Sequence, residues 1–170
     1  MARIPYLVSK INPMRASYLN KVNSPFLYRL FLLNKLPIAW ISGLKIDKVV
    51  PERAAVNIKY GYLNQNPFKS MYFACQAMAA EMSTGLLALG HIDSQDCKVS
   101  MLVIQMNSEF QKKAIGKIQF VCEDGIRVRD AIQKAVDTGE GVVCKMQSNG
   151  YDEQGDCVST FNITWTFKRK

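Results

Sequence analysis

The longest apolar stretch of the chain lies between Asn64 and Gly90 and suits a helix of about 20 residues. From Ser70 onward its positions are apolar or small apart from four polar ones: Gln76, Glu81, Ser83 and Thr84. A helix that is apolar on every side is usually buried. An ionised carboxylate in such a helix costs free energy unless it is paired. The pattern therefore predicts a buried central helix, and Glu81 is the residue in it that most needs a functional explanation.

Runs that alternate apolar and polar residues predict strands on both sides of this helix. Two runs precede it and four follow it: Leu44–Val50, Ala54–Tyr60, Lys98–Phe110, Ala114–Glu123, Val142–Ser148 and Val158–Phe167. Helical spacing predicts one or two helices over residues 14 to 41, broken at Asn23–Pro25 and weakened at Pro37, and a short helix at Ile126–Thr138. This order predicts an α+β fold in which a curved antiparallel sheet wraps around the long helix.

With 170 residues the chain fits one globular unit. We expect an N-terminal helical extension over residues 1–42 and the main domain over residues 43–170. The apolar segment Phe26–Leu44 is interrupted by charged residues and a proline, and it is too broken for a membrane span. The hydrophobic stretch at the N-terminus is too short for a signal peptide. We therefore expect a cytoplasmic protein without an integral membrane segment.

The chain carries 22 Lys and Arg against 14 Asp and Glu, and its net charge of +8 favours anionic partners. The basic residues are scattered along the chain, so we do not expect nucleic acid binding. Membrane headgroups and a phosphorylated small molecule remain as alternatives. The five cysteines form no CxxC pair, and His91 is the only histidine. These residues predict reduced, packed thiols and neither a metal site nor another cofactor.

Two consecutive segments, SMYFACQAMAAEMSTGLLA and KVSMLVIQMNSEFQKKAIGKIQFVCEDG, resemble the hot-dog-fold proteins of the DUF4442 group. These proteins are relatives of PaaI-type acyl-CoA thioesterases. The resemblance covers roughly residues 44–167. It implies a hot-dog fold, an acyl-CoA or other acyl thioester as substrate, and a homodimer or a dimer of dimers. The implied activity is thioester hydrolysis, and the alternative is a non-catalytic protein that binds acyl or other lipid ligands.

In this family the central helix follows an Asn-containing loop and carries Asp or Glu about three turns in. The loop and the start of the helix are matched by Asn66, Ser70, Met71 and Tyr72, and the carboxylate by Glu81. The chain has Lys69 where the family usually has glycine, and it lacks the His-Gly-Gly that precedes the helix in PaaI-like enzymes. Their catalytic carboxylate also lies earlier in the helix, nearer the position of Gln76.

The N-terminus of the central helix offers unpaired N–H groups, which can bind a developing oxyanion. Amides near Ser70 and Met71 are the candidates for this role, and Asn66 is either part of the site or the helix cap. An apolar setting would raise the pKa of Glu81 and suit a general base that activates water. Ser70 and Glu81 stand roughly 16 Å apart along one helix. A site built from both therefore requires two antiparallel helices at a two-fold interface, and hence an obligate dimer.

Four further side chains are candidates for substrate binding: Tyr72, Gln76, Lys112 and Lys113. The two lysines lie at a predicted hairpin and suit the phosphates of coenzyme A. Structural alternatives remain open, in which Glu81 pairs with one of these lysines or caps a neighbouring backbone group, Ser70 caps the helix and Tyr72 packs in the core. The amphipathic segment Phe26–Trp40 could touch a membrane. We expect instead that it packs over the sheet or covers an acyl pocket.

Overall fold

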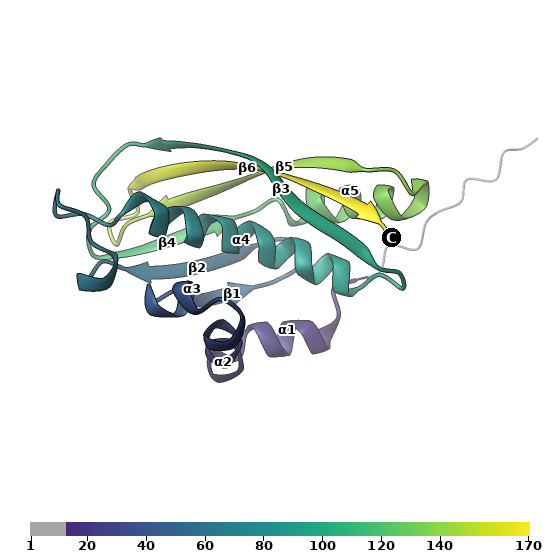
Figure 1. Ribbon diagram of the computed structural model, residues 1–170, viewed down its shortest axis with the longest axis horizontal. Helices are drawn as coiled ribbons and strands as arrows, with labels where there is room; N and C mark the ends of the chain where they lie inside the picture. Colours follow the sequence, from purple (N-terminus) through teal and green to yellow (C-terminus); the bar gives the residue numbers. More distant parts are fainter. Residues whose placement is uncertain (1–12) are drawn as a thin grey trace, which may run out of the picture.

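A long helix, α4 (Phe73–Asp93), lies across one face of an antiparallel sheet that curves around it (Figure 1). The computed structural model describes residues 13–170. Within them the sheet has six strands: β1 (Lys45–Val49), β2 (Ala54–Lys59), β3 (Val99–Phe110), β4 (Lys117–Cys122), β5 (Val142–Tyr151) and β6 (Cys157–Arg169). Their order across the sheet is β1-β2-β4-β5-β6-β3, so β1 and β3 are its edges.

The apolar surface of α4 packs on the sheet, and three of its polar side chains are bonded to individual strands. Three hydrogen bonds join them: Ser83 with Ser148 of β5 (2.7 Å), Trp165 of β6 to Thr84 (3.0 Å) and Ser159 of β6 to Gln76 (2.9 Å). A buried polar group costs free energy unless it is hydrogen-bonded. These bonds therefore fix the rotation of α4 on the sheet, and Glu81 is not among the side chains that they hold.

Three helices precede the sheet: α1 (Ala16–Val22), α2 (Pro25–Lys35) and α3 (Pro37–Ile41). They lie beside α4 and β1 (Figure 1). The side chain of Asn23, between α1 and α2, hydrogen-bonds both backbone groups of Val49 in the edge strand β1. Tyr18 donates its hydroxyl to the carbonyl of Leu86 on α4 at 2.7 Å. The predicted helix break is confirmed, but Pro37 begins α3 because its fixed φ suits the first position of a helix.

The order of elements predicted from the sequence is confirmed, and the arrangement is the hot-dog fold. The remaining helix, α5 (Gly125–Thr138), packs against α4, β5 and β6. The main difference is the start of α4, which the sequence placed near Asn66 or Ser70 and the structure places at Phe73. In the described part of the chain, no helix is long and apolar enough to cross a membrane.

The histidine and the cysteines are part of the packing. The Nε2 atom of His91 lies 3.0 Å from the carbonyl oxygen of Pro51, and because a carbonyl only accepts, Nε2 carries the proton. Burial lowers the pKa of His91, so the neutral ring joins the end of α4 to the β1–β2 turn. All five cysteines are free thiols. Burial raises the pKa of Cys122 to about 12 and that of Cys144 to about 11, which makes both thiols unreactive.

Gly125 is the place where α5 touches the β1–β2 turn. Its amide donates to the carbonyl of Glu52 at 3.1 Å, and an added Cβ would clash with the carbonyl oxygen of Pro51 and lie 2.6 Å from the Cα of Glu52. We predict that Gly125→Ala destabilises the protein by about 1–3 kcal/mol in urea unfolding, because the backbone has to move. Gly141→Ala is the matched control, since its Cβ would meet nothing within 4 Å. Equal stability of the two variants would contradict this close approach.

Candidate functional site

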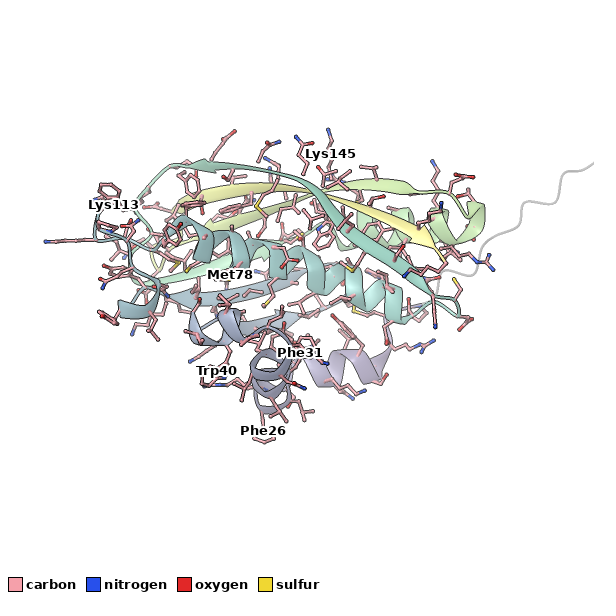
Figure 2. The ribbon with its side chains drawn as sticks, viewed as in Figure 1. Phe26, Phe31, Trp40, Met78, Lys113 and Lys145 are labelled. Carbon is pink, nitrogen blue, oxygen red and sulfur yellow. The ribbon has the colours of Figure 1, made fainter. Side chains whose placement is uncertain are left out.

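Glu81 faces a cavity that lies between α4 and the N-terminal helices. The cavity has a volume of about 590 Å³ and is walled mainly by apolar side chains. Leu27 and Phe31 of α2, Leu89 of α4 and Met101 of β3 are among them, and Phe31 lies between α2 and α4 (Figure 2). Sites for small molecules typically have this size and this apolar character, with a few polar groups that orient the ligand.

The carboxylate of Glu81 forms neither a salt bridge nor a hydrogen bond within residues 13–170. The predicted alternative of a pair with Lys112 or Lys113 is wrong, because Lys112 pairs with acidic residues of the β5–β6 turn and Lys113 donates to a backbone carbonyl. The carboxylate oxygen Oε1 lies beside Gly85, 3.5 Å from the place that a Cβ there would take. Burial raises the pKa of Glu81. An unpaired carboxyl group with a raised pKa at a cavity is typical of a functional site.

Tyr28 of α2 lies close to Glu81 and lines the same cavity. Burial, and next the negative charge of Glu81, raise the pKa of Tyr28 well above its usual value, so the phenol stays protonated. Its hydroxyl is a group near the carboxylate that is able to donate a hydrogen bond, although the two are not bonded in this structure. Sequence reasoning did not select Tyr28, because it precedes Glu81 by 53 residues and its spacing in α2 is that of a core residue.

The loop that leads into α4 is organised by Asn66. Its side-chain oxygen accepts from the amides of Phe68 at 2.9 Å and Ser70 at 3.3 Å, and its side-chain NH₂ donates to Ser70 Oγ at 3.1 Å. Both predicted helix caps, Asn66 and Ser70, are therefore wrong. The N-cap residue is Tyr72, and it has no side-chain capping bond. Asn66 and Ser70 instead hold the loop in place before the helix begins.

The free amides of α4 lie further along the chain than the sequence suggested. The amides of Ser70 and Met71 both donate to acceptors in neighbouring loops, so neither is free to bind an oxyanion. The amides of Phe73 and Ala74 open the helix, and within residues 13–170 neither has an acceptor. They mark the positive end of the helix. At 1.5 Å per residue they stand about 10–12 Å from Glu81, so one chain does not bring the two groups together.

Two of the predicted substrate-binding side chains are already paired within the protein. Gln76 is buried, donates to the carbonyl of Met71 at 3.2 Å and accepts from Ser159 of β6 at 2.9 Å. It therefore ties the start of α4 to the sheet. Lys112 lies 2.6 and 2.7 Å from two carboxylates of the β5–β6 turn. Hydrogen bonds to these carboxylates raise its pKa, so its charge is balanced inside the protein.

The other two predicted substrate-binding side chains, Lys113 and Tyr72, remain exposed beside the start of α4. Lys113 donates to the carbonyl of Phe68 at 3.1 Å, which places its ammonium group at the loop before the helix. The ring of Tyr72 packs edge-on against Phe73, with 4.8 Å between the ring centroids. The ring is nevertheless exposed rather than packed in the core, which was the structural alternative. Both side chains are free to contact a ligand at this end of α4.

A second hollow, of about 1070 Å³, lies on the face of the sheet that α4 does not cover. Its wall consists mainly of amide and charged side chains, among them Gln119, Lys145, Gln147 and Asn162. Such a wall suits polar ligands and does not suit a hydrocarbon chain. The cavity at Glu81 is therefore the better candidate site for an apolar ligand.

Residues 27–167 match the protein family described as a domain of unknown function, DUF4442. The chain belongs to the DUF4442 family. The match begins within α2, so the family's domain includes part of the N-terminal helices as well as the sheet and α4. No curated protein matches the chain.

Solved structures share the fold of this DUF4442 protein at low sequence identity. PA5026 from Pseudomonas aeruginosa, called a probable thioesterase, is 22% identical, with 94% of this chain and 99% of that chain covered and a TM-score of 0.69. A putative thioesterase from Shewanella oneidensis is 8% identical, with 89% of this chain and 98% of that chain covered and a TM-score of 0.69. Thioesterase HI1161 from Haemophilus influenzae is 10% identical, with 86% and 91% covered and a TM-score of 0.63.

The structure explains one departure of this DUF4442 protein from its family pattern. Lys69, at a position where the family usually has glycine, has a φ of 58°. This left-handed region is readily reached by glycine and only at some cost by other residues. The loop before α4 therefore has at Lys69 a backbone conformation that suits glycine, and it presents a lysine before the start of the helix.

We predict that Glu81→Gln makes the protein more stable at pH 7. The pKa of Glu81 is raised in the folded state from its usual 4.5. As the pH rises through 4.5, the unfolded chain loses this proton before the folded protein does, and the folded state loses stability until its own pKa is passed. The variant has no such loss, so its melting temperature should exceed that of the wild type at pH 7 and equal it well below pH 4.5.

The control for this comparison is Glu140→Gln, which changes an exposed glutamate between α5 and β5 and should not alter the stability at either pH. A wild type that is more stable than the Glu81 variant at pH 7 would mean that the carboxylate has a stabilising partner in solution.

Proposed function

We propose that this protein binds an acyl thioester, such as an acyl-CoA, and hydrolyses it with Glu81 as the general base. The observation that carries this proposal is the unpaired Glu81 carboxylate at an apolar cavity. A half-buried carboxylate in apolar surroundings that had a purely structural role would be expected to have an ionic or hydrogen-bonding partner. The fold shared with PA5026, called a probable thioesterase, and with thioesterase HI1161 supports the substrate class.

The cavity between α2 and α4 would hold the acyl chain. Leu27 and Phe31 on one side and Leu89 on the other offer apolar walls, and Met101 adds a flexible side chain that adapts to chain length. With the chain inserted, the thioester carbonyl would lie beside Glu81. The carboxylate would then lie close to the reacting bond, in mainly apolar surroundings.

The chemistry follows from the raised pKa of Glu81, which makes it a stronger base than an exposed glutamate. Its carboxylate removes a proton from a water molecule while the water oxygen bonds to the carbonyl carbon of the thioester. The tetrahedral intermediate then breaks its C–S bond. The departing sulfur takes the proton from Glu81, and the products are a free carboxylic acid and a thiol. Tyr28 would orient the carboxylate or the water through its hydroxyl.

A second subunit would supply the oxyanion site. Phe73, Ala77 and Glu81 are spaced four residues apart and share one face of α4. If two α4 helices cross antiparallel with the two-fold axis at Ala77, residue 73 of one chain lies opposite residue 81 of the other, because both are four residues from the axis. The free amides of Phe73 and Ala74 of one subunit would then reach the carbonyl held beside Glu81 of its partner.

The edge strand β3 supports a homodimer. It is 12 residues long, and among the described residues it is hydrogen-bonded to another strand, β6, on one side only. It also exposes four large apolar side chains: Leu102, Ile104, Met106 and Phe110. A long apolar edge strand is a template for pairing with another chain. We propose that β3 pairs with β3 of a second copy and so brings the two α4 helices together.

Coenzyme A would place its phosphates near the start of α4. Lys113 is held there by the carbonyl of Phe68, and Lys69 lies in the same loop. The positive end of the helix and these two ammonium groups form an electropositive rim. Lys112 is not part of this proposal, because two carboxylates already balance its charge.

A non-catalytic protein that binds acyl or other lipid ligands is the second candidate. The distance between Glu81 and the free amides at the start of α4 favours this candidate. In the described part of one chain, these amides are too far away to bind an oxyanion that forms beside Glu81. The cavity would serve this role unchanged. Turnover separates the two candidates, since only the first releases a free thiol.

We predict that Glu81→Gln lowers the rate of acyl-CoA hydrolysis by about 10²–10⁴-fold, because it removes the base and keeps the shape of the side chain. The measurement is chromatographic release of free CoA from short, medium and long acyl-CoAs, since the five thiols of the chain interfere with thiol-reactive dyes.

Glu140→Gln serves as the control and should hydrolyse acyl-CoA at the wild-type rate. Hydrolysis by the wild type that is unchanged in the Glu81 variant would remove Glu81 as the base. No hydrolysis of any acyl-CoA, together with a bound lipid seen by native mass spectrometry, would favour the ligand-binding alternative.

We predict that Leu102→Lys combined with Ile104→Lys converts the dimer to a monomer and abolishes hydrolysis, because charges on an edge strand oppose pairing. Light scattering coupled to size-exclusion chromatography measures the mass. Val143→Lys is the control, since Val143 is an exposed apolar residue on the interior strand β5. Full activity in a monomeric variant would exclude a site that is shared between subunits.

A further inference from the structure

The side of α2 that points away from the core is apolar. Tyr28 and Leu32 are the buried residues of this helix. Phe26, Leu30 and Leu33 are spaced four and three residues apart, so they form one face on the other side. Phe26 is 76% exposed, and Figure 2 shows it at the end of the molecule farthest from the sheet. This is unusual, because the apolar side of a helix normally faces the core.

The short helix α3 continues this apolar surface. Its outward side chains Ile38, Trp40 and Ile41 are all exposed, Ile38 by 63%. Trp40 lies below α4 beside α2 in Figure 2. We use the term outer helical face for the exposed apolar residues of the two helices: Phe26, Leu30, Leu33, Ile38, Trp40 and Ile41. Contiguous exposed apolar surface of this kind marks an interaction site.

The positive charge of the chain is concentrated in the same segment. Residues 1–46 contain seven Lys and Arg and no Asp or Glu, whereas residues 47–170 contain 15 Lys and Arg and 14 Asp and Glu. Almost all of the net charge of +8 therefore belongs to the first quarter of the chain. An anionic partner is drawn to this part of the molecule rather than to the sheet.

The basic side chains on these helices are free to face such a partner. Lys21, Arg29 and Lys35 are exposed, and within the described residues none of them forms a salt bridge. Arg29 is the one that borders Phe26 and Leu30 on α2, whereas Lys21 lines the cavity at Glu81 and Lys35 lies on the other side of the helix near its end. Arg29 lies over the ring of Trp40, with 5.8 Å from its guanidinium carbon to the ring centre. Arginine and tryptophan side chains each combine an apolar body with a polar end, and both suit the boundary between lipid and water.

From this combination we infer that the outer helical face docks the protein on the surface of a membrane that contains anionic lipids. The apolar side chains enter the boundary between headgroups and acyl chains, and the basic side chains meet the lipid phosphates. A second copy of this chain is the weaker candidate for the same surface. A two-fold contact through it would set Arg29 of both subunits close together without any acidic partner on these helices.

Docking in this way would place the cavity at the membrane. Leu27 and Phe31 of the same helix line the cavity at Glu81, so α2 would have lipid on one side and the acyl site on the other. The inference does not depend on thioester hydrolysis, because membrane binding can be measured without substrate and in the Glu81→Gln variant.

The test is sedimentation of the full chain with vesicles of phosphatidylcholine alone and of phosphatidylcholine mixed with phosphatidylglycerol. The wild type should bind the anionic vesicles and lose this binding as salt is added. The triple variant Phe26→Ser, Leu30→Ser and Leu33→Ser should bind at least about tenfold more weakly, because three apolar side chains no longer insert. Arg29→Glu with Lys35→Glu should weaken binding to anionic vesicles.

The matched control replaces three exposed apolar residues near the start of α4: Tyr62→Ser, Leu63→Ser and Phe68→Ser. It should bind vesicles as the wild type does. The replaced side chains are exposed in both triple variants, and circular dichroism with thermal melting shows that each is folded. The inference is overturned if the wild type fails to bind anionic vesicles or if the two triple variants bind equally well. It is also overturned if replacing Phe26, Leu30 and Leu33 lowers only the oligomeric mass, which would make the outer helical face a contact between copies.

Discussion

The hydrogen bonds between α4 and strands β5 and β6 are the constraint on which the rest of the structure depends. Apolar packing alone would allow a helix that is apolar on all sides to rotate on the sheet. Ser83, Thr84 and Gln76 each have a partner on the sheet, and any rotation would leave these groups buried without one. The rotation that satisfies them turns Glu81 toward the N-terminal helices. The candidate site is thus a consequence of how the core satisfies its polar groups.

The N-terminal helices have two roles in this arrangement. On the inner side, α2 covers Glu81, and the resulting burial raises the pKa of the carboxyl group. On the outer side the same helix leaves Phe26 and Leu30 in water, beside Arg29. The edge strand β3 and the free amides at the start of α4 are likewise incomplete in a single chain. These features without a partner in one chain are the basis of the dimer and of the membrane contact proposed above.

The central carboxylate was predictable from the sequence, and the details of the site around it were not. Glu81 stands out because an apolar helix rarely contains a charge. Asn66 and Ser70 have the residue types of helix caps, yet they bond to each other in the loop, since local side-chain bonds compete with helix formation. Gln76 lies near the position of the catalytic carboxylate in PaaI-like enzymes, but its side chain already accepts a hydrogen bond from Ser159. The sequence did not indicate that Tyr28 belongs to the site, because it comes close to Glu81 only when α2 packs over α4.

The sequence by itself determined the kind and order of the elements, because hydrophobic periodicity is a local property that each segment carries with it. It also determined that a long apolar helix with one carboxylate would be the centre of the fold. Only the tertiary structure decided which way Glu81 points, which amides of α4 remain free and which residues of α2 stay exposed. These depend on contacts between segments far apart in the chain. Such contacts arise from packing and from the pairing of buried polar groups, and no local pattern encodes them.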